Sequence, residues 1–383
     1  MKIAFVCGHY LPDLGYLEVH LARALVKLNH NVTVITSSAV PAYVKSKVKR
    51  IPAIGEADDG GVHVIRLKPV LAFGQLVWCR GVRKEVEAIH PELVIAIGLG
   101  KIFPRPVLRS VPYKLAVLLG DNSHTYSKMN WRQRTIQRFI KKPVYEKAMA
   151  AADRIFSYTP ETVSVLKDWI SESGMKYLGQ KNTFISLGFD QQTFYESPRL
   201  RQEGRAELAI DENEVLLISV ARMGANKNFT GFLKAFESQV ENGQPVKCLL
   251  VGIGDDPFST AIKNQIESSP VSHRFITRPF VNHEELNRLY NASDIGYWPI
   301  TAISIYEGMG TGLFLLVPES GSLSHLELNG VRGQYVRENL HEDLRSAMKN
   351  YHRISREERA EKSRNSFSYQ TIATRLLETM KSV

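Results

Sequence analysis

Cysteine is scarce in this chain, which has only three copies among 383 residues: Cys7, Cys79 and Cys248. They are odd in number, lie far apart and form no C-x-x-C spacing, which argues against a disulfide framework and against a zinc site. We therefore expect all three to be small apolar residues inside a core.

Long apolar runs and a leader pattern are also missing. No segment approaches the uninterrupted stretch of about 20 apolar residues that a membrane span needs. The opening sequence MKIAFVCGHYLPD has one basic residue before a short apolar stretch and soon reaches Asp13, so it does not have the pattern of a cleaved signal. These absences predict a soluble, cytoplasmic protein.

Acidic residues are fewer than basic ones: 39 Asp and Glu stand against 49 Lys and Arg, a net charge of +10. Such a field favours polyanionic partners, whether nucleotide phosphates, nucleic acid or an anionic membrane face, and does not choose among them. The length predicts two or three domains, because a domain usually has roughly 100 to 200 residues.

Short apolar runs rich in Val, Ile and Leu alternate with stretches of helical periodicity, which is typical of repeated βα units around a parallel sheet. The chain is therefore predicted to be α/β. Residues 187–213 have many charges and little apolar periodicity, which favours an interdomain connection. Strand candidates lie at 2–7, 32–36, 63–67, 92–98, 114–120 and 154–158 before this connection, and within 214–222, 247–256, 273–279, 294–299 and 313–319 after it.

Two cations follow the first strand candidate of the second series. That strand ends at Ala221, Arg222 and Lys227 flank a short loop, and a helix opens near Asn228. Free N–H groups at a helix start, together with Arg and Lys, suit a diphosphate. Two solvated surface cations would give the same sequence.

Three further polar motifs stand at predicted strand ends. Gly254 belongs to a lone G-x-G, which often marks only a tight turn. Glu307 is a single carboxylate among glycines, the pattern of an acceptor for ribose hydroxyls or of an acid that caps a helix. His124 follows the candidate at 114–120 and would bind a sugar hydroxyl, handle a proton or serve as a hydrogen-bonded structural residue.

The order and spacing of these motifs resemble the GT-B glycosyltransferases of glycosyltransferase family 4. The segments that carry the resemblance are residues 2–37, 185–194 (ISLGFDQQTF), 219–236 (SVARMGANKNFTGFLKAF), 249–257, 274–299 and 306–321. It implies two Rossmann-like, doubly wound parallel-sheet domains facing an interdomain cleft. Residues 1–185 would form the acceptor-side domain, 186–365 the nucleotide-sugar domain, and 366–383 a helix that packs back on the first.

The resemblance also implies roles for individual residues. Arg222 and Lys227 would hold the diphosphate of a sugar nucleotide, and Glu307 would accept hydrogen bonds from the ribose. The remaining members of the implied site are Phe280 and Val281 near the base, Gly15 in a loop that approaches the phosphates, Gly254 and Ser304 in the donor site, and His124 beside the transferred sugar.

The sequence departs from the family at one point. The family usually has a second glutamate eight positions before the one at Glu307, and here that position is Pro299. Either the loop is shortened or Thr301 and Ser304 take its place, which leaves the donor sugar open.

The implied activity is retaining transfer of a sugar from a nucleoside-diphosphate sugar, UDP or GDP, to a hydroxyl of a glycan, glycolipid or other acceptor. The two cations would stabilise the leaving diphosphate as a metal ion does elsewhere. No D-x-D motif stands at a strand end, and Asp255-Asp256 has the pattern of a turn. We therefore predict a metal-independent enzyme with no obligatory cofactor.

Basic residues with interleaved aromatics at 128–142, and the run at 44–50, predict peripheral contact with the anionic inner face of a membrane and a lipid-linked acceptor. A helix that packs its apolar side on the sheet would share the pattern. A nucleic-acid-binding or DNA-modifying protein also fits the charge, although no helix-turn-helix, zinc-finger or RNP-like sequence supports it. A sugar-nucleotide epimerase or hydrolase is a further alternative on the same fold.

Overall fold

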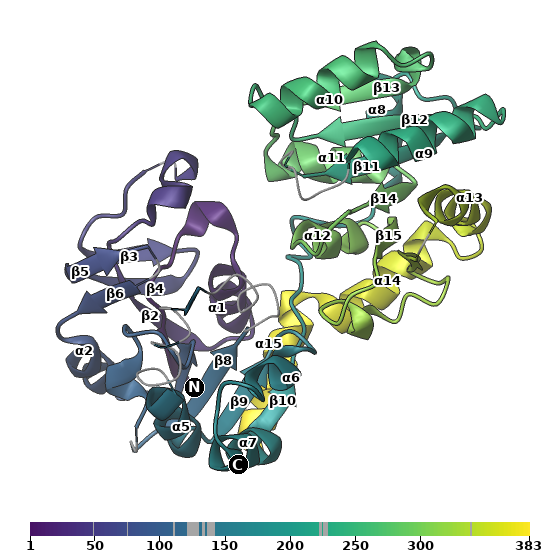
Figure 1. The fold of residues 1–383 in the computed structure, drawn as a ribbon. Coiled ribbons are helices and arrows are strands. Elements are labelled where there is room, and N and C mark those ends of the chain that lie inside the picture. Colours follow the sequence, from purple (N-terminus) through teal and green to yellow (C-terminus); the bar gives the residue numbers. More distant parts are fainter. Residues whose placement is uncertain are drawn as a thin grey trace. The chain divides into compact units, whose positions relative to one another are not determined.

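The computed structural model describes residues 1–48, 50–74, 76–109, 112–120, 130–131, 135, 142–221, 224, 229–337 and 339–383. The chain divides into two compact units (Figure 1). Unit 1 comprises Met1–Leu187 together with Tyr369–Val383, and unit 2 comprises Gly188–Ser368. The borders lie a few residues beyond those expected from the sequence. None of the helices in the described ranges combines the length and apolarity that crossing a bilayer requires.

Unit 1 is built on an eight-stranded sheet with the order β10-β9-β8-β7-β1-β2-β4-β3. All its neighbours pair in parallel except β3 and β4. The six strands expected from the sequence are present. The strands are β1 (Lys2–Val6), β2 (Asn31–Ser37), β3 (Gly55–Asp59), β4 (Val62–Leu67), β7 (Leu93–Ile97), β8 (Lys114–Leu119), β9 (Arg154–Ser157) and β10 (Asn182–Phe184), and a separate hairpin is formed by β5 (Pro69–Phe73) and β6 (Leu76–Cys79).

Helices cover both faces of this sheet. One apolar core joins the sheet to α1 (Leu17–Lys27) and α15 (Tyr369–Lys381), and the other joins it to α2 (Val82–Ile89), α5 (Lys142–Ala151) and α7 (Glu172–Lys181). The carboxyl-terminal helix α15 packs against α1, as predicted, with Ile372, Leu376 and Leu377 buried. Shorter elements are α6 (Thr162–Leu166), η1 (Pro12–Leu14), η2 (Ala42–Lys47) and η3 (Arg105–Val107).

Unit 2 repeats the design with a six-stranded, all-parallel sheet in the order β13-β12-β11-β14-β15-β16. Its strands are β11 (Val215–Val220), β12 (Val246–Val251), β13 (Phe275–Arg278), β14 (Ile295–Tyr297), β15 (Phe314–Pro318) and β16 (Gly333–Val336). The sequences VLLISV of β11 and FLLVP of β15 are continuous apolar runs because a parallel sheet is buried on both faces. The predicted α/β class is thereby confirmed.

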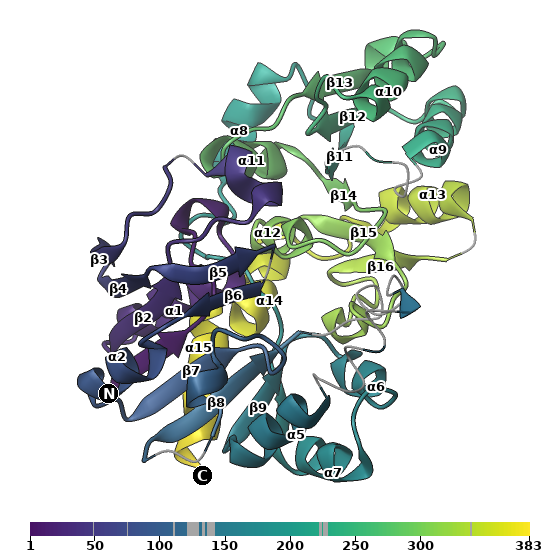
Figure 2. The same ribbon diagram turned by 60° about the vertical axis from the view of Figure 1, so that its left-hand side comes forward.

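The helices of unit 2 lie on both faces of its sheet (Figure 2). One core contains residues of α9 (Phe229–Glu241), α10 (Pro257–Glu267) and α13 (Leu340–Asn350). The others are α8 (Pro198–Glu207), α11 (His283–Ala292), α12 (Ser304–Gly310) and α14 (Arg356–Phe367), with the short turns η6 (Ser272–Arg274) and η7 (Ser324–Leu326). All three cysteines are buried and free, as predicted.

The connection expected at 187–213 is largely folded into unit 2. Ser197 caps α8 by accepting a hydrogen bond from the Leu200 N–H, and α8 packs along α11. The apolar periodicity is weak because the buried residues of α8 are Gly204 and Arg205 rather than aliphatic side chains. The helix is therefore held by polar contacts.

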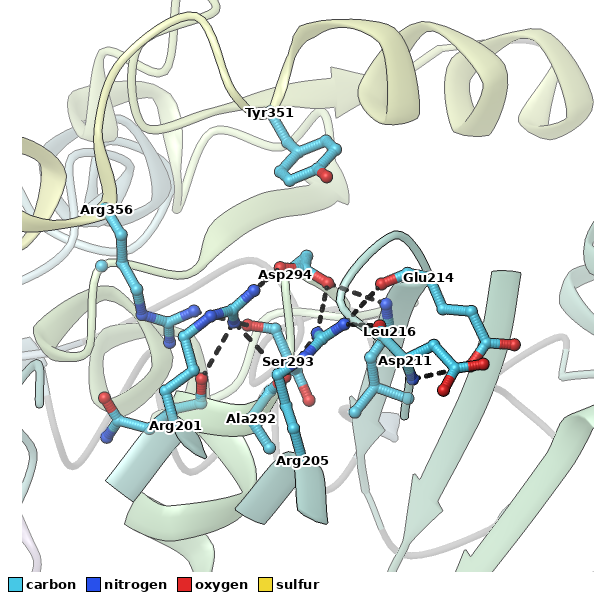
Figure 3. Close-up of polar contacts among 12 residues, drawn as sticks. Arg201, Arg205, Asp211, Glu214, Leu216, Ala292, Ser293, Asp294, Tyr351 and Arg356 are labelled. Atoms are coloured by element: carbon cyan, nitrogen blue, oxygen red, sulfur yellow. Dashed lines mark hydrogen bonds and ion pairs between the residues drawn. The ribbon is translucent and has the colours of Figure 1, made fainter. Parts of the chain in front are cut away.

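Asp294 is the centre of those contacts (Figure 3). Its side chain is 4% exposed and lies between two cations of α8: Arg201 Nη2 is 2.6 Å from Oδ1, and Arg205 Nη1 is 3.2 Å from Oδ2. The backbone N–H of Leu216 in β11 donates to Oδ2 at 2.8 Å. One buried carboxylate thus joins α8, β11 and the start of β14.

The same arginines reach the carboxyl end of α11, where the last helical carbonyls lack partners within the helix. Arg201 Nη1 donates to the carbonyl of Asn291 at 3.1 Å, and Arg356 of α14 donates to the carbonyls of Tyr290 and Ser293. Burial lowers the pKa of Arg356 to about 9, which leaves it charged at neutral pH. We call Arg201, Arg205, Asp294 and Arg356 the Asp294 cluster.

Replacing Asp294 by Ala is expected to lower the free energy of unfolding of unit 2 by about 3–5 kcal/mol, because Arg205 and Arg201 lose their buried counter-charge. The control is Glu203→Gln on the same helix, which removes the exposed 2.6 Å pair with Arg199 and should cost less than about 1 kcal/mol. Urea unfolding measures both. Equal effects of the two substitutions would contradict the central role of Asp294.

Candidate functional site

A pocket of about 270 Å³ opens at the carboxyl edge of the unit 2 sheet. The chain runs outward from β11 to β12 and β13, and then returns to place β14 on the other side of β11. The strand order therefore reverses between β11 and β14, and ligands of open α/β sheets bind beside such a reversal. Val220 and Ala221 at the end of β11, and Trp298 and Pro299 after β14, line the pocket.

The wall of this pocket is mostly apolar, with a few polar side chains. This composition is typical of sites that bind small molecules. The lining residues are Val220, Ala221, Val251, Gly252, Phe280, Val281, His283, Leu286, Trp298, Pro299, Ile300, Ala302, Ser304 and Glu307. Four predicted donor-site residues, Phe280, Val281, Ser304 and Glu307, are thus brought together.

Glu307 supplies the only carboxylate among the described residues that line the pocket. It is partly buried in the first turn of α12, rather than before it, and that helix has no side-chain cap. Burial raises the pKa of Glu307 to about 7, and within the described residues no ion pair or side-chain hydrogen bond to its carboxylate offsets that cost. A carboxylate in this state accepts hydrogen bonds from a ligand without first breaking internal ones.

Ser304 and Thr301, the two expected replacements for the missing glutamate, differ in position. Ser304 lines the pocket, and its Oγ accepts a hydrogen bond of 2.9 Å from the indole Nε1 of Trp298. Thr301 is exposed and is not part of the lining, with its Oγ1 3.4 Å from Ser320 Oγ. Pro299 itself belongs to the wall, so the position of the missing acid is apolar.

Phe280 and Val281 come from the loop between β13 and α11, and His283 is the first residue of α11. The side chain of Phe280 is 79% exposed although it lines the pocket, whereas Val281 is 8% exposed. Burial lowers the pKa of His283, and its ring lies 5.6 Å from that of Phe194. Phe280 thus offers an open aromatic face to a flat ligand group.

Gly252 lines the pocket and Gly254 does not. Gly252 has φ of +101°, a conformation that side chains rarely adopt, so only glycine suits this turn. The N–H of Gly254 donates to Ser259 Oγ at 3.0 Å, beside the Asp256 side chain that caps α10. The lone G-x-G is therefore a turn whose first glycine meets the pocket.

Arg222, Lys227 and His124 are outside the described residues; the first two belong to the segment between pocket-lining Ala221 and the start of α9 at Phe229. Gly15 lies in unit 1 at the end of η1, with φ of +58°. Sequence reasoning missed Gly252, His283 and Trp298. The order FVNH after β13, and a Trp directly after β14, are signals that could have found the last two.

The chain is similar to known glycosyltransferases. Residues 201–370 match the family model described as Glycosyl transferases group 1. The chain is 22% identical over 373 residues to an uncharacterized glycosyltransferase of Methanocaldococcus jannaschii, covering 88% of this chain and 85% of that protein. It is 24% identical over 308 residues to an alpha-monoglucosyldiacylglycerol synthase of Acholeplasma laidlawii, covering 77% of this chain and 73% of that protein.

Among solved structures, the protein HepE of Anabaena in complex with UDP superposes with a TM-score of 0.67 at 16% identity, and the match covers 100% of both chains. At this identity the likeness concerns the fold. The two parallel-sheet units of the present chain have the GT-B fold.

The raised pKa of Glu307 makes stability depend on pH. The carboxyl of Glu307 ionises near pH 4.5 in the unfolded chain and near pH 7 in the folded one. Its ionisation therefore lowers the free energy of unfolding progressively between pH 4.5 and pH 7, and by a constant amount at higher pH. Glu307→Gln should match the wild type at pH 4 and exceed its free energy of unfolding at pH 8 by on the order of 3 kcal/mol. Urea unfolding across this range is the measurement, and a pH-independent difference between the two proteins would contradict the assignment.

Proposed function

Because residues 201–370 match the Glycosyl transferases group 1 model and the two units have the GT-B fold, we propose that this chain is a glycosyltransferase that moves a sugar from a nucleoside-diphosphate sugar to an acceptor hydroxyl, with retention at the anomeric carbon. The observation that carries the proposal is the pocket at the strand reversal of unit 2, where Glu307 faces an otherwise largely apolar wall. A mostly apolar wall with a few polar groups, as this pocket has, is typical of sites that bind small molecules.

In this proposal the nucleotide lies along the lining residues in order. Phe280 and Val281 contact the base, and the Glu307 carboxylate accepts hydrogen bonds from the ribose hydroxyls. The diphosphate then reaches the segment that follows Ala221, where Arg222 and Lys227 stand in the sequence. UDP and GDP are the first donors to test, and the complex of HepE with UDP supports UDP.

The proposed chemistry relies on stabilising the leaving group. The bond between the anomeric carbon and the diphosphate oxygen breaks, the acceptor oxygen bonds to the same face of the sugar, and the acceptor proton moves to the departing phosphate. Arg222 and Lys227 neutralise the charge that develops on the diphosphate, so we propose that no metal ion is needed. His124 and Gly15 keep their roles beside the transferred sugar and the phosphates within this proposal.

We propose a lipid-linked acceptor and a peripheral location at the cytoplasmic face of a membrane. The name of the Acholeplasma laidlawii relative gives a glucosylated diacylglycerol as its product, which supports an acceptor of this kind. The net charge of +10 supports attraction to anionic lipid.

Loss of either proposed diphosphate cation should abolish most turnover. Arg222→Ala and Lys227→Ala are expected to lower kcat about 100-fold or more, since each removes a charge that acts on the leaving group. The control is Lys263→Ala, which removes an exposed cation of α10 paired with Asp255 and should leave kcat unchanged. A thermal-shift panel of UDP, GDP, ADP and dTDP first identifies the donor nucleotide. The assay then measures release of that nucleoside diphosphate from its sugar conjugate. Wild-type turnover in both cation variants would overturn this mechanism.

Nucleotide affinity should rise with pH around the raised pKa of Glu307. Below about 7 the carboxyl is largely protonated, and above it the carboxylate accepts charge-assisted hydrogen bonds from the ribose. Kd is measured by calorimetric titration for the wild type and for Glu307→Gln at pH 6 and at pH 8. The ratio of the wild-type Kd to the variant Kd is expected to be lower at pH 8 than at pH 6. The variant corrects for ionisation of the nucleotide phosphate. A Kd ratio between the two proteins that does not change with pH would argue against the ribose contact.

A further inference from the structure

The β5–β6 hairpin of unit 1 carries apolar side chains on its outward face. It is a separate two-stranded antiparallel sheet in which Leu71 pairs with Trp78 and Phe73 with Leu76 (Figure 2). Residues directly paired across two strands point to the same face. The four side chains therefore share one face, which we call the hairpin face.

The opposite face of the hairpin is anchored in the core of unit 1. Val77 and Cys79 are 1% and 3% exposed and belong to the same core cluster as Phe103. A Cβ added at Gly8, two residues after β1, would lie 3.9 Å from the Cβ of Val77. The hairpin is thus seated beside the carboxyl end of β1.

The hairpin face is exposed to a degree that the fold of unit 1 does not require. Phe73 is 83% exposed, Leu71 52%, and Leu76 and Trp78 40% each. Single exposed apolar residues are ordinary, but a contiguous patch marks a surface that binds something.

The charges around this face indicate the kind of partner. Residues 60–84 contain no Asp or Glu, whereas Lys68 and Arg80 are exposed at the open end of the hairpin, where β5 begins and β6 ends, and Lys84 is exposed in α2. A protein partner would be expected to meet a rim with polar groups of both signs. Apolar side chains with a Trp, in a stretch of sequence whose charged residues are all basic, instead match the boundary between acyl chains and anionic headgroups.

We propose that the β5–β6 hairpin is the element by which unit 1 inserts into the surface of an anionic lipid bilayer. The hairpin face enters the headgroup boundary, and Lys68 and Arg80 meet the lipid phosphates. This inference rests on the proposed function in one respect: a lipid-linked acceptor would require the enzyme to bind a membrane. It brings the carboxyl edge of the unit 1 sheet, beside Gly8, to the membrane.

The test uses the full chain with vesicles of phosphatidylcholine alone and of phosphatidylcholine mixed equally with phosphatidylglycerol, at low salt. The wild type should sediment with the anionic vesicles only. Phe73→Ser should weaken the partition coefficient about tenfold, and Lys68→Gln and Arg80→Gln about fivefold each. Phe258→Ser, the same change at a 49% exposed position of α10 in unit 2, is the matched control and should bind as the wild type does.

A spectroscopic signal locates the insertion. Anionic vesicles should shift the Trp fluorescence of the wild type to shorter wavelength, and Trp78→Phe should remove most of this shift while keeping most of the binding. The thermal shift produced by UDP is measured in parallel and should be equal in all variants, because the pocket lies in unit 2. A failed vesicle result with an intact UDP shift therefore rejects the hairpin proposal and leaves the proposed function standing.

Three outcomes overturn the proposal. The first is a wild type that no anionic vesicle retains. The second is a Phe73→Ser protein that binds like the wild type, which would place the contact on another surface such as the basic stretch at 128–142. The third is size-exclusion behaviour in which Phe73→Ser converts a dimer to a monomer without any effect on vesicles, which would make the hairpin face a contact between two copies of this chain.

Discussion

The buried carboxylate of Asp294 is the contact on which the arrangement of unit 2 depends. It accepts from the Leu216 N–H at the start of β11 and sits directly before β14, so it fixes these two strands side by side at their amino ends. At their carboxyl ends, Ser219 Oγ donates to the Tyr297 carbonyl at 2.8 Å, and the strands then part into the pocket. The Asp294 cluster and the pocket therefore occupy opposite edges of the same two strands. Anchoring one edge with ionic contacts leaves the other edge open for a ligand.

Much of this fold could be predicted from the sequence, because parallel strands covered on both faces appear as continuous apolar runs. The elements that were missed lack that signal for physical reasons. Helix α8 buries Arg205 instead of an aliphatic stripe, so its stability comes from Asp294, far away in the sequence. The hairpin β5–β6 exposes four of the five residues of β5, so it shows no alternation that periodicity would detect. Apolar periodicity in the sequence detects elements that bury apolar residues, so it does not detect α8 or the β5–β6 hairpin.

The candidate site was predictable to a similar extent. Phe280 and Val281, from the loop between β13 and α11, and Ser304 and Glu307, from α12, do line one pocket. The roles of Arg222, Lys227, His124 and Gly15 stay predictions, as does membership of family 4 within the glycosyltransferases. Gly254 was predicted for the site and Gly252 was not, although both fit the motif, because the positive φ of Gly252 and its place in the pocket wall are visible only in the structure. The apolar wall at Pro299 gives a physical basis for expecting a donor sugar that is not held there by an acid.

The central claim is that the Glu307 carboxylate binds the ribose of a nucleoside diphosphate in the unit 2 pocket. The most direct measurement is a double cycle by calorimetry, with the wild type and Glu307→Ala each titrated with UDP and with 2′,3′-dideoxy-UDP. The account predicts that removal of the hydroxyls weakens wild-type binding about tenfold or more and leaves the affinity of the variant nearly unchanged, since a hydrogen bond to a charged group contributes about 1.5–3 kcal/mol. Equal losses in the two proteins would contradict it.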